Sequence, residues 1–510
     1  MTHTEQAEVV AFLSRPASYP QQPSAVTRID THSALVFLVG DRAFKMKRAV
    51  RYTFLDFSTL DARRAACEAE YRLNRRAAPD LYLGVEAVTR DAAGRLSIGG
   101  TGTPIEWLVV MRRFADDALL DRVAVEGRLT PRLAERLAEV VARFHAGAAP
   151  APHEGGAASM REVVDDNTRA LEAAADLVPA ADVRRLAEAC DRVVAAHGEL
   201  LDARRAGGFV RQCHGDLHLR NIVLVDGEPT LFDAIEFNDT FACIDVWYDV
   251  AFLLMDLVAR GLPDAASVVF NQYLQRTGDL GGLPLLPLYL ATRAAVRAKT
   301  SVASARLEEG EARQAFERRA RDYLSLAVRL STPATPRLVA VGGCSGSGKS
   351  TLAAALAPLV GAAPGAVVLR SDVIRKRLLH RDPDERLDSS GYTAEVTARV
   401  YRALAVQAAD LLAHGWPVIV DATFLDARER AAMAAVADHA GVPFAGLWLE
   451  ADREVMTARL DQRTGDASDA TVETLERQLR LDTGPIDWTR LDASRPLASL
   501  TSAARAVIGA

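Results

Sequence analysis

The segment from Gly343 to Ser350 reads GCSGSGKS and satisfies the pattern G-x-x-x-x-G-K-[ST]. It follows an apolar run, LVAVG, typical of a buried strand, and precedes STLAAALAPLV, which is typical of a helix. Glycines at these positions let backbone N–H groups approach a phosphate where the helix dipole favours negative charge. The motif requires a strand, a tight loop and a helix in that order. The sequence therefore predicts an α/β domain that binds nucleotide phosphates.

The side chains of this loop define two further roles. Lys349 is expected to reach the β- and γ-phosphates of ATP, and Ser350 to bind Mg²⁺. We expect the whole loop to contact the nucleotide: Gly343, Cys344, Ser345, Gly346, Ser347, Gly348, Lys349, Ser350 and Thr351.

Further strands are predicted at AVVLRSD, PVIVDAT and AGLWLEA, with helices between them. This alternation is typical of a parallel, doubly wound sheet, which binds ligands at the carboxyl ends of its strands. Asp372 and Asp421 fall at two such ends. We expect Asp421 to bind the metal ion beside Ser350.

Residues from about 337 to 510 resemble P-loop kinases of small molecules and polynucleotides, including the zeta-toxin-like ones. The resemblance is carried by GCSGSGKS, PVIVDAT, SDVIRKRL and EVMTARLDQRTGDASDAT. It implies that Asp372 activates the acceptor hydroxyl and that Arg375, one helical turn later, holds an anionic acceptor. It also implies that Arg459 and Arg463 of a lid contact phosphates. The alternatives are that Asp372 only caps a helix and that the arginines form a solvated face.

A second constellation lies in RQCHGDLHLRNIVLVDGEPTLFD, residues 211–233. Two apolar runs flank Asp-Gly, a strong hairpin signal. The hairpin returns Asp233 to the vicinity of Asn221 and Asp216. Carboxylate and amide oxygens that converge in this way suit a magnesium nucleotide site.

HGDLHLRN followed by LFD resembles the catalytic core of aminoglycoside phosphotransferase-like kinases, which share the bilobal protein-kinase fold. The resemblance covers most of residues 25–330. It implies that Asp216 is the catalytic base and that Asn221 and Asp233 are metal ligands.

The same resemblance suggests supporting roles for three neighbours. His214 is expected to prop the catalytic loop, and His218 to pack near the site without taking part in chemistry. IDVWYDVA matches the family's segment after the metal aspartate, in which Asp249 would brace the loop.

The N-terminal lobe supplies the remaining nucleotide contacts. RAFKMK resembles the strand that carries the phosphate lysine, so we expect Lys45 in that role, with Lys47 on the same strand face as the alternative. Glu70 is the expected ion-pair partner, with Glu68 as the alternative. WLVVM, ending at Met111, falls where backbone groups would contact adenine.

One departure from the family pattern concerns the phosphates. No G-x-G-x-x-G loop precedes Lys45, and the chain has RIDTHSALVFLVGD instead. The backbone and hydroxyls of THS are expected to cover the phosphates, which leaves the choice of ATP over GTP open.

Acidic residues bear on the acceptor of the N-terminal half. Glu236 and Asp239 follow the metal aspartate closely, and Asp165 and Asp166 lie in the helical part of the chain. A polyamine sugar would favour such carboxylates, so Glu236 is our candidate for binding the acceptor. The alternative is that these groups only solvate the surface.

The seam between the two halves is STPATPR, residues 331–337. We predict a kinase-like α+β domain over residues 1–330, with a strand-rich lobe at about 25–112 and a helical lobe at about 113–330. A linker at 331–336 would lead to an α/β P-loop domain at 337–510.

Net charge, hydropathy and cysteine spacing indicate which partners and which compartment to expect. The net charge is −6, which does not favour nucleic acid as a partner of the N-terminal half, and no apolar run is long enough for a membrane span. The five cysteines have no paired spacing, as expected in a reducing cytoplasm.

These observations lead to one hypothesis and one alternative. The hypothesis is a bifunctional ATP- and Mg²⁺-dependent phosphotransferase. Its N-terminal half acts on a hydroxyl of an aminoglycoside- or sugar-like molecule, and its C-terminal half on a hydroxyl of a small molecule, nucleotide or polynucleotide. The alternative is a regulatory ATP-binding protein in which one half is idle and controls the other half or a partner. Neither the acceptors nor the oligomeric state can be read from the sequence.

Overall fold

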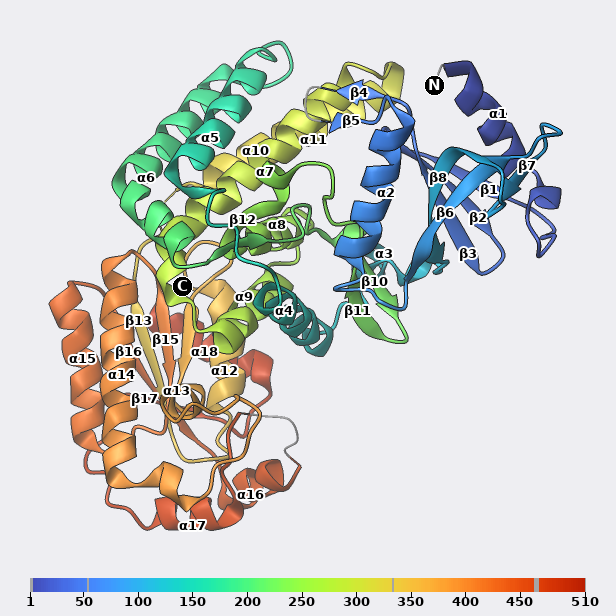
Figure 1. Cartoon of the computed structure of the whole chain (residues 1–510). Coiled ribbons are helices and arrows are strands. Elements are labelled where there is room, and N and C mark those ends of the chain that lie inside the picture. Colours follow the sequence, from blue (N-terminus) through green and yellow to red (C-terminus); the bar gives the residue numbers. More distant parts are fainter. Residues whose placement is uncertain (1–2, 53–54, 333, 463–466, 510) are drawn as a thin grey trace. The chain divides into compact units, whose positions relative to one another are not determined.

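The computed structural model describes residues 3–52, 55–332, 334–462 and 467–509. The chain divides into two compact units, one formed by Met1–Ala175 and Cys190–Asp256 and the other by Asp176–Ala189 and Leu257–Ala510 (Figure 1). Among the described residues, no helix combines the length and the apolar character that a membrane span requires.

The first unit opens with a six-stranded antiparallel sheet in the order β1-β2-β3-β8-β6-β7. Its strands are β1 (Thr27–Asp30), β2 (Ala34–Val39), β3 (Arg42–Lys47), β6 (Tyr82–Arg90), β7 (Leu96–Ile98) and β8 (Thr103–Arg112). ALVFLV and RAFKMK coincide with β2 and β3, so the predicted strand-rich start of an α+β fold is confirmed.

Each face of this sheet packs against a different helix. α1 (His3–Leu13) packs on one face with Phe44 and Met46 of β3. α2 (Leu60–Asn74) packs on the other face, next to Ala43. Because side chains alternate along a strand, Lys45 and Lys47 share the α2 face with Ala43.

A hairpin in the first unit brings the predicted metal ligands together. The two-residue turn Asp226-Gly227 joins β10 (Ile222–Val225) to β11 (Glu228–Leu231). Both turn residues have positive φ, 52° and 86°, as a turn that matches the twist of the strands requires. Ile222 pairs with Leu231, so Asn221 and Asp233 flank the same end of the hairpin.

The rest of the first unit is mainly helical. Its other elements include α3 (Leu120–Val125), α4 (Pro131–Ala146), α5 (Gly156–Glu172), β9 (Val210–Gln212), α7 (Asp239–Ala242) and β12 (Cys243–Asp245). Two helices, α6 (Ala180–Ala206) and α8 (Val246–Ala259), contribute residues to both units.

The second unit contains a five-stranded parallel sheet in the order β14-β15-β13-β16-β17. Its strands are β13 (Leu338–Gly342), β14 (Val367–Arg370), β15 (Val418–Asp421), β16 (Phe444–Glu450) and β17 (Thr489–Asp492). β13 lies at the centre; from it the chain passes to the edge strand β14, returns to β15 beside β13, and then continues to β16 and β17 on the other side. The predicted doubly wound P-loop fold is therefore confirmed.

Helices cover both faces of the parallel sheet (Figure 1). α12 (Lys349–Leu356) and α18 (Leu497–Ile508) share an apolar cluster with Val339 and Val341 of β13. α14 (Ala394–Ala413) and α15 (Ala427–Ala440) lie along the other face. The remaining helices near the strand ends are α13 (Ser371–Leu378), α16 (Arg453–Asp461) and α17 (Val472–Leu479).

Three helices that precede the predicted linker also belong to the second unit: α9 (Pro263–Thr277), α10 (Leu286–Ala305) and α11 (Gly310–Leu330). Asn271 on α9 bonds the edge strand β14, because its side chain accepts from the Val368 N–H at 2.8 Å and donates to the Ala366 oxygen at 3.1 Å. The first compact unit thus ends at Asp256, ahead of the predicted domain boundary at 331–336, which stays a prediction.

Candidate active sites

Asp216 and Asn221 lie on one loop between β9 and β10. The Asn221 Nδ2 group donates to the Asp216 backbone oxygen at 3.0 Å and to its carboxylate Oδ2 at 2.9 Å. These bonds use the amide nitrogen, so Oδ1 of Asn221 is the atom left to bind a cation. His218 also approaches the carboxylate, with Nε2 at 3.3 Å from Oδ2 of Asp216.

Asp249 braces this loop from a fully buried position on α8. Its carboxylate accepts from the backbone N–H groups of His214 at 3.0 Å and Gly215 at 2.9 Å. Burial lowers the pKa of His214, which favours the neutral ring. The neutral ring can then donate from Nε2 to the Phe232 oxygen at 2.9 Å and accept from the Asp216 N–H at 3.3 Å. These contacts fit the supporting roles expected of Asp249 and His214.

Lys45, Glu70 and Asp233 meet at the α2 face of the sheet. Lys45 Nζ lies 2.9 Å from Glu70 Oε1 and also contacts Asp233 Oδ1. Burial opposes the charge of Lys45, but Asp233 and Glu70 outweigh it and raise the pKa of Lys45 well above its ordinary value. Burial likewise favours a neutral Asp233, and Lys45 outweighs it to lower the pKa of Asp233. The lysine therefore stays charged and Asp233 ionised.

Lys47 has separate partners. Its Nζ lies 2.5 Å from Glu70 Oε2 and pairs with Glu236 Oε1. The Glu236 side chain is only 5% exposed, and burial raises its pKa. The prediction that Glu236 binds the acceptor therefore requires correction, because this carboxylate faces Lys47 inside the protein. Glu68 is half-exposed and pairs with Arg64 on its own helix, so the geometry favours Glu70 over Glu68.

Other predicted contacts of the first unit lie around this centre. Met111 is buried on β8, opposite Ala43 of β3. In the segment THS, the Thr31 hydroxyl donates to the Ala34 oxygen at 2.9 Å, so this hydroxyl stabilises the turn before β2. The remaining acidic candidates lie on helices: Asp239 on α7, and Asp165 and Asp166 on α5.

The phosphate loop of the second unit depends on its glycines. Gly343 and Gly346 have φ of 137° and 81°, a region that L side chains rarely adopt. A Cβ atom at Gly343 would lie 2.6 Å from the Leu449 oxygen, and one at Gly346 would lie 2.6 Å from the Met456 oxygen. Glycine is therefore required at both positions for the loop to form a cradle of backbone amides.

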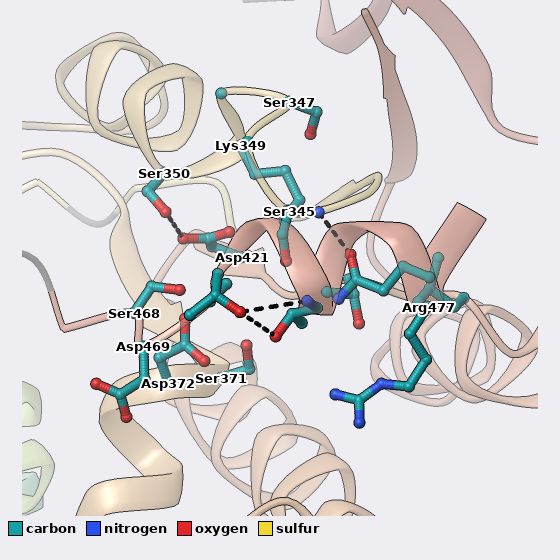
Figure 2. Close-up of a pocket in the computed structure, with 18 of the residues that line it drawn as sticks. Ser345, Ser347, Lys349, Ser350, Ser371, Asp372, Asp421, Ser468, Asp469 and Arg477 are labelled. Atoms are coloured by element: carbon teal, nitrogen blue, oxygen red, sulfur yellow. Dashed lines mark hydrogen bonds between the residues drawn. The ribbon is translucent and has the colours of Figure 1, made fainter. Parts of the chain in front are cut away.

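Lys349, Ser350 and Asp421 meet beneath this cradle. Ser350 Oγ donates to Asp421 Oδ2 at 2.6 Å, as Figure 2 shows. Lys349 Nζ donates to the Cys344 oxygen at 2.9 Å, so the lysine folds back over its own loop. Arg370 at the end of β14 approaches the same carboxylate, with Nε at 3.4 Å. A hydroxyl and a carboxylate thus lie side by side under the phosphate position.

Asp372 and Arg375 both line a pocket of about 1510 Å³ beside this loop. Figure 2 places Asp372 close to Ser468 and Asp469, and burial raises the pKa of Asp372 despite the opposing effects of Arg370 and Ser468. Asp372 is not the N-cap of α13, because Arg370 holds that position.

Arg375 lines the pocket and also makes contacts with the segment before α14. The residue is 6% exposed; its guanidinium donates to the Gly391 oxygen at 2.9 Å and stacks 4.7 Å from the Tyr392 ring centroid. These contacts hold the segment before α14, and Arg375 also lines the pocket, so its role of holding an anionic acceptor stays a prediction.

The lid predicted from EVMTARLDQRTGDASDAT is only partly described. Arg459 on α16 donates to the Ala493 oxygen at 2.8 Å and approaches the Ser347 oxygen at 3.4 Å, so it lies against the phosphate loop. Arg463 lies outside the described residues. Gln478 on α17 contacts the cradle directly, because its Oε1 accepts from the Ser345 N–H at 2.7 Å (Figure 2). A bound phosphate would compete with Gln478 for this amide.

Gln478 and Glu429 are two of the pocket residues that the prediction did not include. Gln478 follows the last motif along the chain and has no sequence signal of its own. Glu429 does have a signal, because it is an acidic residue in the first turn of the helix that follows PVIVDAT. Both line the pocket with Asp372.

We expect Glu429 to make stability fall as pH rises. Burial raises the pKa of Glu429 to about 7, against the opposing hydrogen bond from Tyr401. The folded state then binds this proton more tightly than the unfolded state, so stability declines from about pH 4.5 to about pH 7. Glu429→Gln should flatten that decline and stabilise the protein at pH 8 by on the order of 1 kcal/mol, after allowance for solvent screening of a partly exposed group.

Thermal melts between pH 5 and pH 8 measure this effect. The matched control is Glu473→Gln, which changes an exposed carboxylate lining the same pocket. Parallel melting profiles of the wild type and Glu429→Gln across this range would contradict the expectation.

Two family models match the chain. The one described as "Phosphotransferase enzyme family" matches residues 30–286, and the one described as "AAA domain" matches residues 338–484. Uncharacterized proteins of Mycobacterium bovis and Mycobacterium tuberculosis are 36% identical over 482 residues, which cover 92% of this chain and 92% of theirs.

Solved kinases are similar to parts of the chain. A gluconokinase from Sinorhizobium meliloti is 24% identical and covers 34% of this chain and 92% of its own, with a TM-score of 0.26. A choline/ethanolamine kinase family protein from Mesorhizobium loti is 15% identical and covers 64% of this chain and 99% of its own, with a TM-score of 0.36. The APS kinase of Mycobacterium tuberculosis is 21% identical and covers 35% of this chain and 100% of its own, with a TM-score of 0.25.

Proposed function

Because the chain belongs to the phosphotransferase enzyme family through residues 30–286 and carries a P-loop kinase-like domain at residues 338–484, we propose that it is a bifunctional ATP-dependent phosphotransferase. Each half transfers the γ-phosphate of ATP to a hydroxyl of its own small-molecule acceptor. The observation that carries this proposal is that each half assembles a full set of charged groups for phosphoryl transfer.

In the N-terminal half, Asp216 accepts the proton of the acceptor hydroxyl while that oxygen forms its bond to the γ-phosphorus. The bond from phosphorus to the bridging oxygen breaks, and ADP leaves. Lys45, oriented by Glu70, binds the phosphates, and the network around Asp249 keeps Asp216 in place. The acceptor is a small molecule of the aminoglycoside or sugar class.

In the C-terminal half, the cradle amides and Lys349 bind the phosphates. Asp372 takes the proton of the acceptor hydroxyl as the same pair of bonds forms and breaks. Its raised pKa suits proton transfer, because a base works best when its pKa lies near the working pH.

Both sites have the donors that Mg²⁺ prefers. Asn221 Oδ1 and the Asp233 carboxylate would hold it in the first site, and Ser350 Oγ and the Asp421 carboxylate in the second, all hard oxygen ligands. Bound Mg²⁺ neutralises charge on the transferring phosphoryl group. The 2.6 Å bond between Ser350 Oγ and Asp421 Oδ2 supports this assignment, because it brings the two oxygens together.

We expect the full chain to bind two molecules of a non-hydrolysable ATP analogue. Lys349→Ala should weaken one site at least about tenfold, the scale of a lost charge-assisted hydrogen bond, and leave the other unchanged. Isothermal titration calorimetry with Mg²⁺ present measures both sites.

The reciprocal variant is the matched control. Lys45→Ala should weaken the other site by a similar factor, and the double variant should be weakened at both sites. A single site that neither substitution alters would contradict the proposal.

A further inference from the structure

Five charged side chains alternate in sign along one row, which is buried at the end that holds Glu70, Lys47 and Glu236. The order is Asp233, Lys45, Glu70, Lys47 and Glu236, and each contacts the next. Glu70 holds Lys45 with Oε1 at 2.9 Å and Lys47 with Oε2 at 2.5 Å. The Glu70, Lys47 and Glu236 side chains are 0%, 4% and 5% exposed, so this end of the row is shielded from water.

The segment that follows β11 needs external support. Asp233 has φ of 62°, in the left-handed region that costs free energy for a residue with a Cβ. The backbone N–H of Asp233 donates to the Tyr82 hydroxyl at 3.1 Å, and that of Ala234 donates to Asn74 Oδ1 at 2.8 Å. Tyr82 lies on β6 and Asn74 on α2, so the sheet and its helix both hold this turn.

The next residues complete the support. The Ile235 N–H donates to the His214 oxygen at 2.9 Å. The Glu236 side chain pairs with Lys47 in the row described above. Three successive amides and one carboxylate are thus fixed by different elements around Asp233. Because Lys47 is buried between two carboxylates, it is not placed to bind a phosphate.

We propose that the Lys47–Glu236 ion pair positions Asp233 as a metal ligand and Glu70 as the partner of Lys45. This inference rests on the proposed function of the N-terminal half. Without Glu236, the Lys47 charge would be balanced by Glu70 alone and would draw that carboxylate away from Lys45. The segment after Asp233 would also lose its side-chain anchor to the sheet.

The test measures how strongly Mg²⁺ enhances nucleotide binding at the first site. The Lys349→Ala chain is titrated with a non-hydrolysable ATP analogue, once with Mg²⁺ and once with EDTA. We expect Glu236→Gln to reduce the ratio of the two affinities about 10–100-fold, as loss of a group that orients a metal ligand does. The affinity in EDTA should fall less than the affinity with Mg²⁺, because without the metal only the pairing of Lys45 with Glu70 is affected, whereas with Mg²⁺ the metal ligand Asp233 is affected as well.

Two further variants separate positioning from simple structural support. Lys47→Met/Glu236→Leu removes both charges, and apolar replacement of a buried ion pair commonly restores stability. Its melting temperature should therefore recover while the Mg²⁺ enhancement stays low; recovery of both would overturn the proposal. Glu68→Gln, on the same helix as Glu70, should behave as the wild type, and a reduced enhancement in this variant would also overturn it.

The Asp233→Asn variant separates failure of the positioning role from failure of the proposed function. If Asp233→Asn lowers the Mg²⁺ enhancement and Glu236→Gln does not, the positioning role is wrong and the proposed function stands. If neither Asp233→Asn nor Lys45→Ala alters binding at this site, the proposed function of the N-terminal half is wrong and the positioning role falls with it.

Discussion

Replacing Asp216 with Asn is expected to lower phosphoryl transfer by the N-terminal half at least ~100-fold, the scale of a lost general base. The amide oxygen of the new residue can still accept from Asn221 Nδ2, a bond that measures 2.9 Å to the native carboxylate. The loop should therefore keep its shape and nucleotide affinity, while the group that takes the hydroxyl proton is gone.

The measurement is transfer of labelled γ-phosphate from ATP to a metabolite extract, in the full chain with the second site silenced by Lys349→Ala. Asp226→Asn is a matched control, because Asp226 lies in the exposed hairpin turn and Asn tolerates its positive φ. Transfer by Asp216→Asn at close to the control rate would remove Asp216 from the catalytic role.

The local patterns of the sequence predicted the elements that carry both sites. The Asp-Gly turn predicted the hairpin of β10 and β11, since few other residues adopt two successive positive φ angles. The strand, loop and helix around Gly343–Ser350 were equally specific, because backbone amides can form such a cradle only with glycine at Gly343 and Gly346. In both cases the backbone conformation or the close packing at one position allows few residue types, so the sequence pattern is specific.

The sequence did not determine which partners Lys45, Lys47 and Glu236 contact, because these contacts depend on long-range packing. Lys45 and Lys47 lie on the same face of β3, and the pattern of the strand cannot tell which lysine faces Asp233 and which faces Glu236. Closeness in sequence placed Glu236 near Asp233 but could not show that its side chain turns toward Lys47. The direction of a side chain depends on which elements pack around it.

For Arg375 and for the domain boundary, too, local sequence patterns did not predict the long-range contacts. The helical spacing of Asp372 and Arg375 correctly placed both beside the pocket, yet Arg375 is held by the Gly391 oxygen of a distant segment. Likewise, the Pro/Thr seam at 331–337 marks a change of composition. The bonds from Asn271 to β14, which group α9 with the second unit, have no local signature.

The last prediction concerns Asp372→Asn, studied in a chain whose first site is silenced by Lys45→Ala. Transfer by the C-terminal half should fall at least ~100-fold, because an amide cannot take the proton of the acceptor hydroxyl. Binding of the ATP analogue and the melting temperature should barely change, since the amide oxygen can still accept the hydrogen bond that Ser468 gives to Asp372.

The rival role for Asp372 is structural. Capping of α13 does not account for it, because Arg370 is the N-cap and Asp372 lies within the first turn. What remains is support of the segment that contains Ser468, and Asn would preserve that support. Asp426→Asn is the matched control: Asp426 lines the same pocket and caps α15 by accepting from the Arg428 N–H at 2.8 Å, a bond that Asn also makes. If both variants transfer label at the same rate, Asp372 is a structural residue; if only Asp372→Asn fails, it is the base.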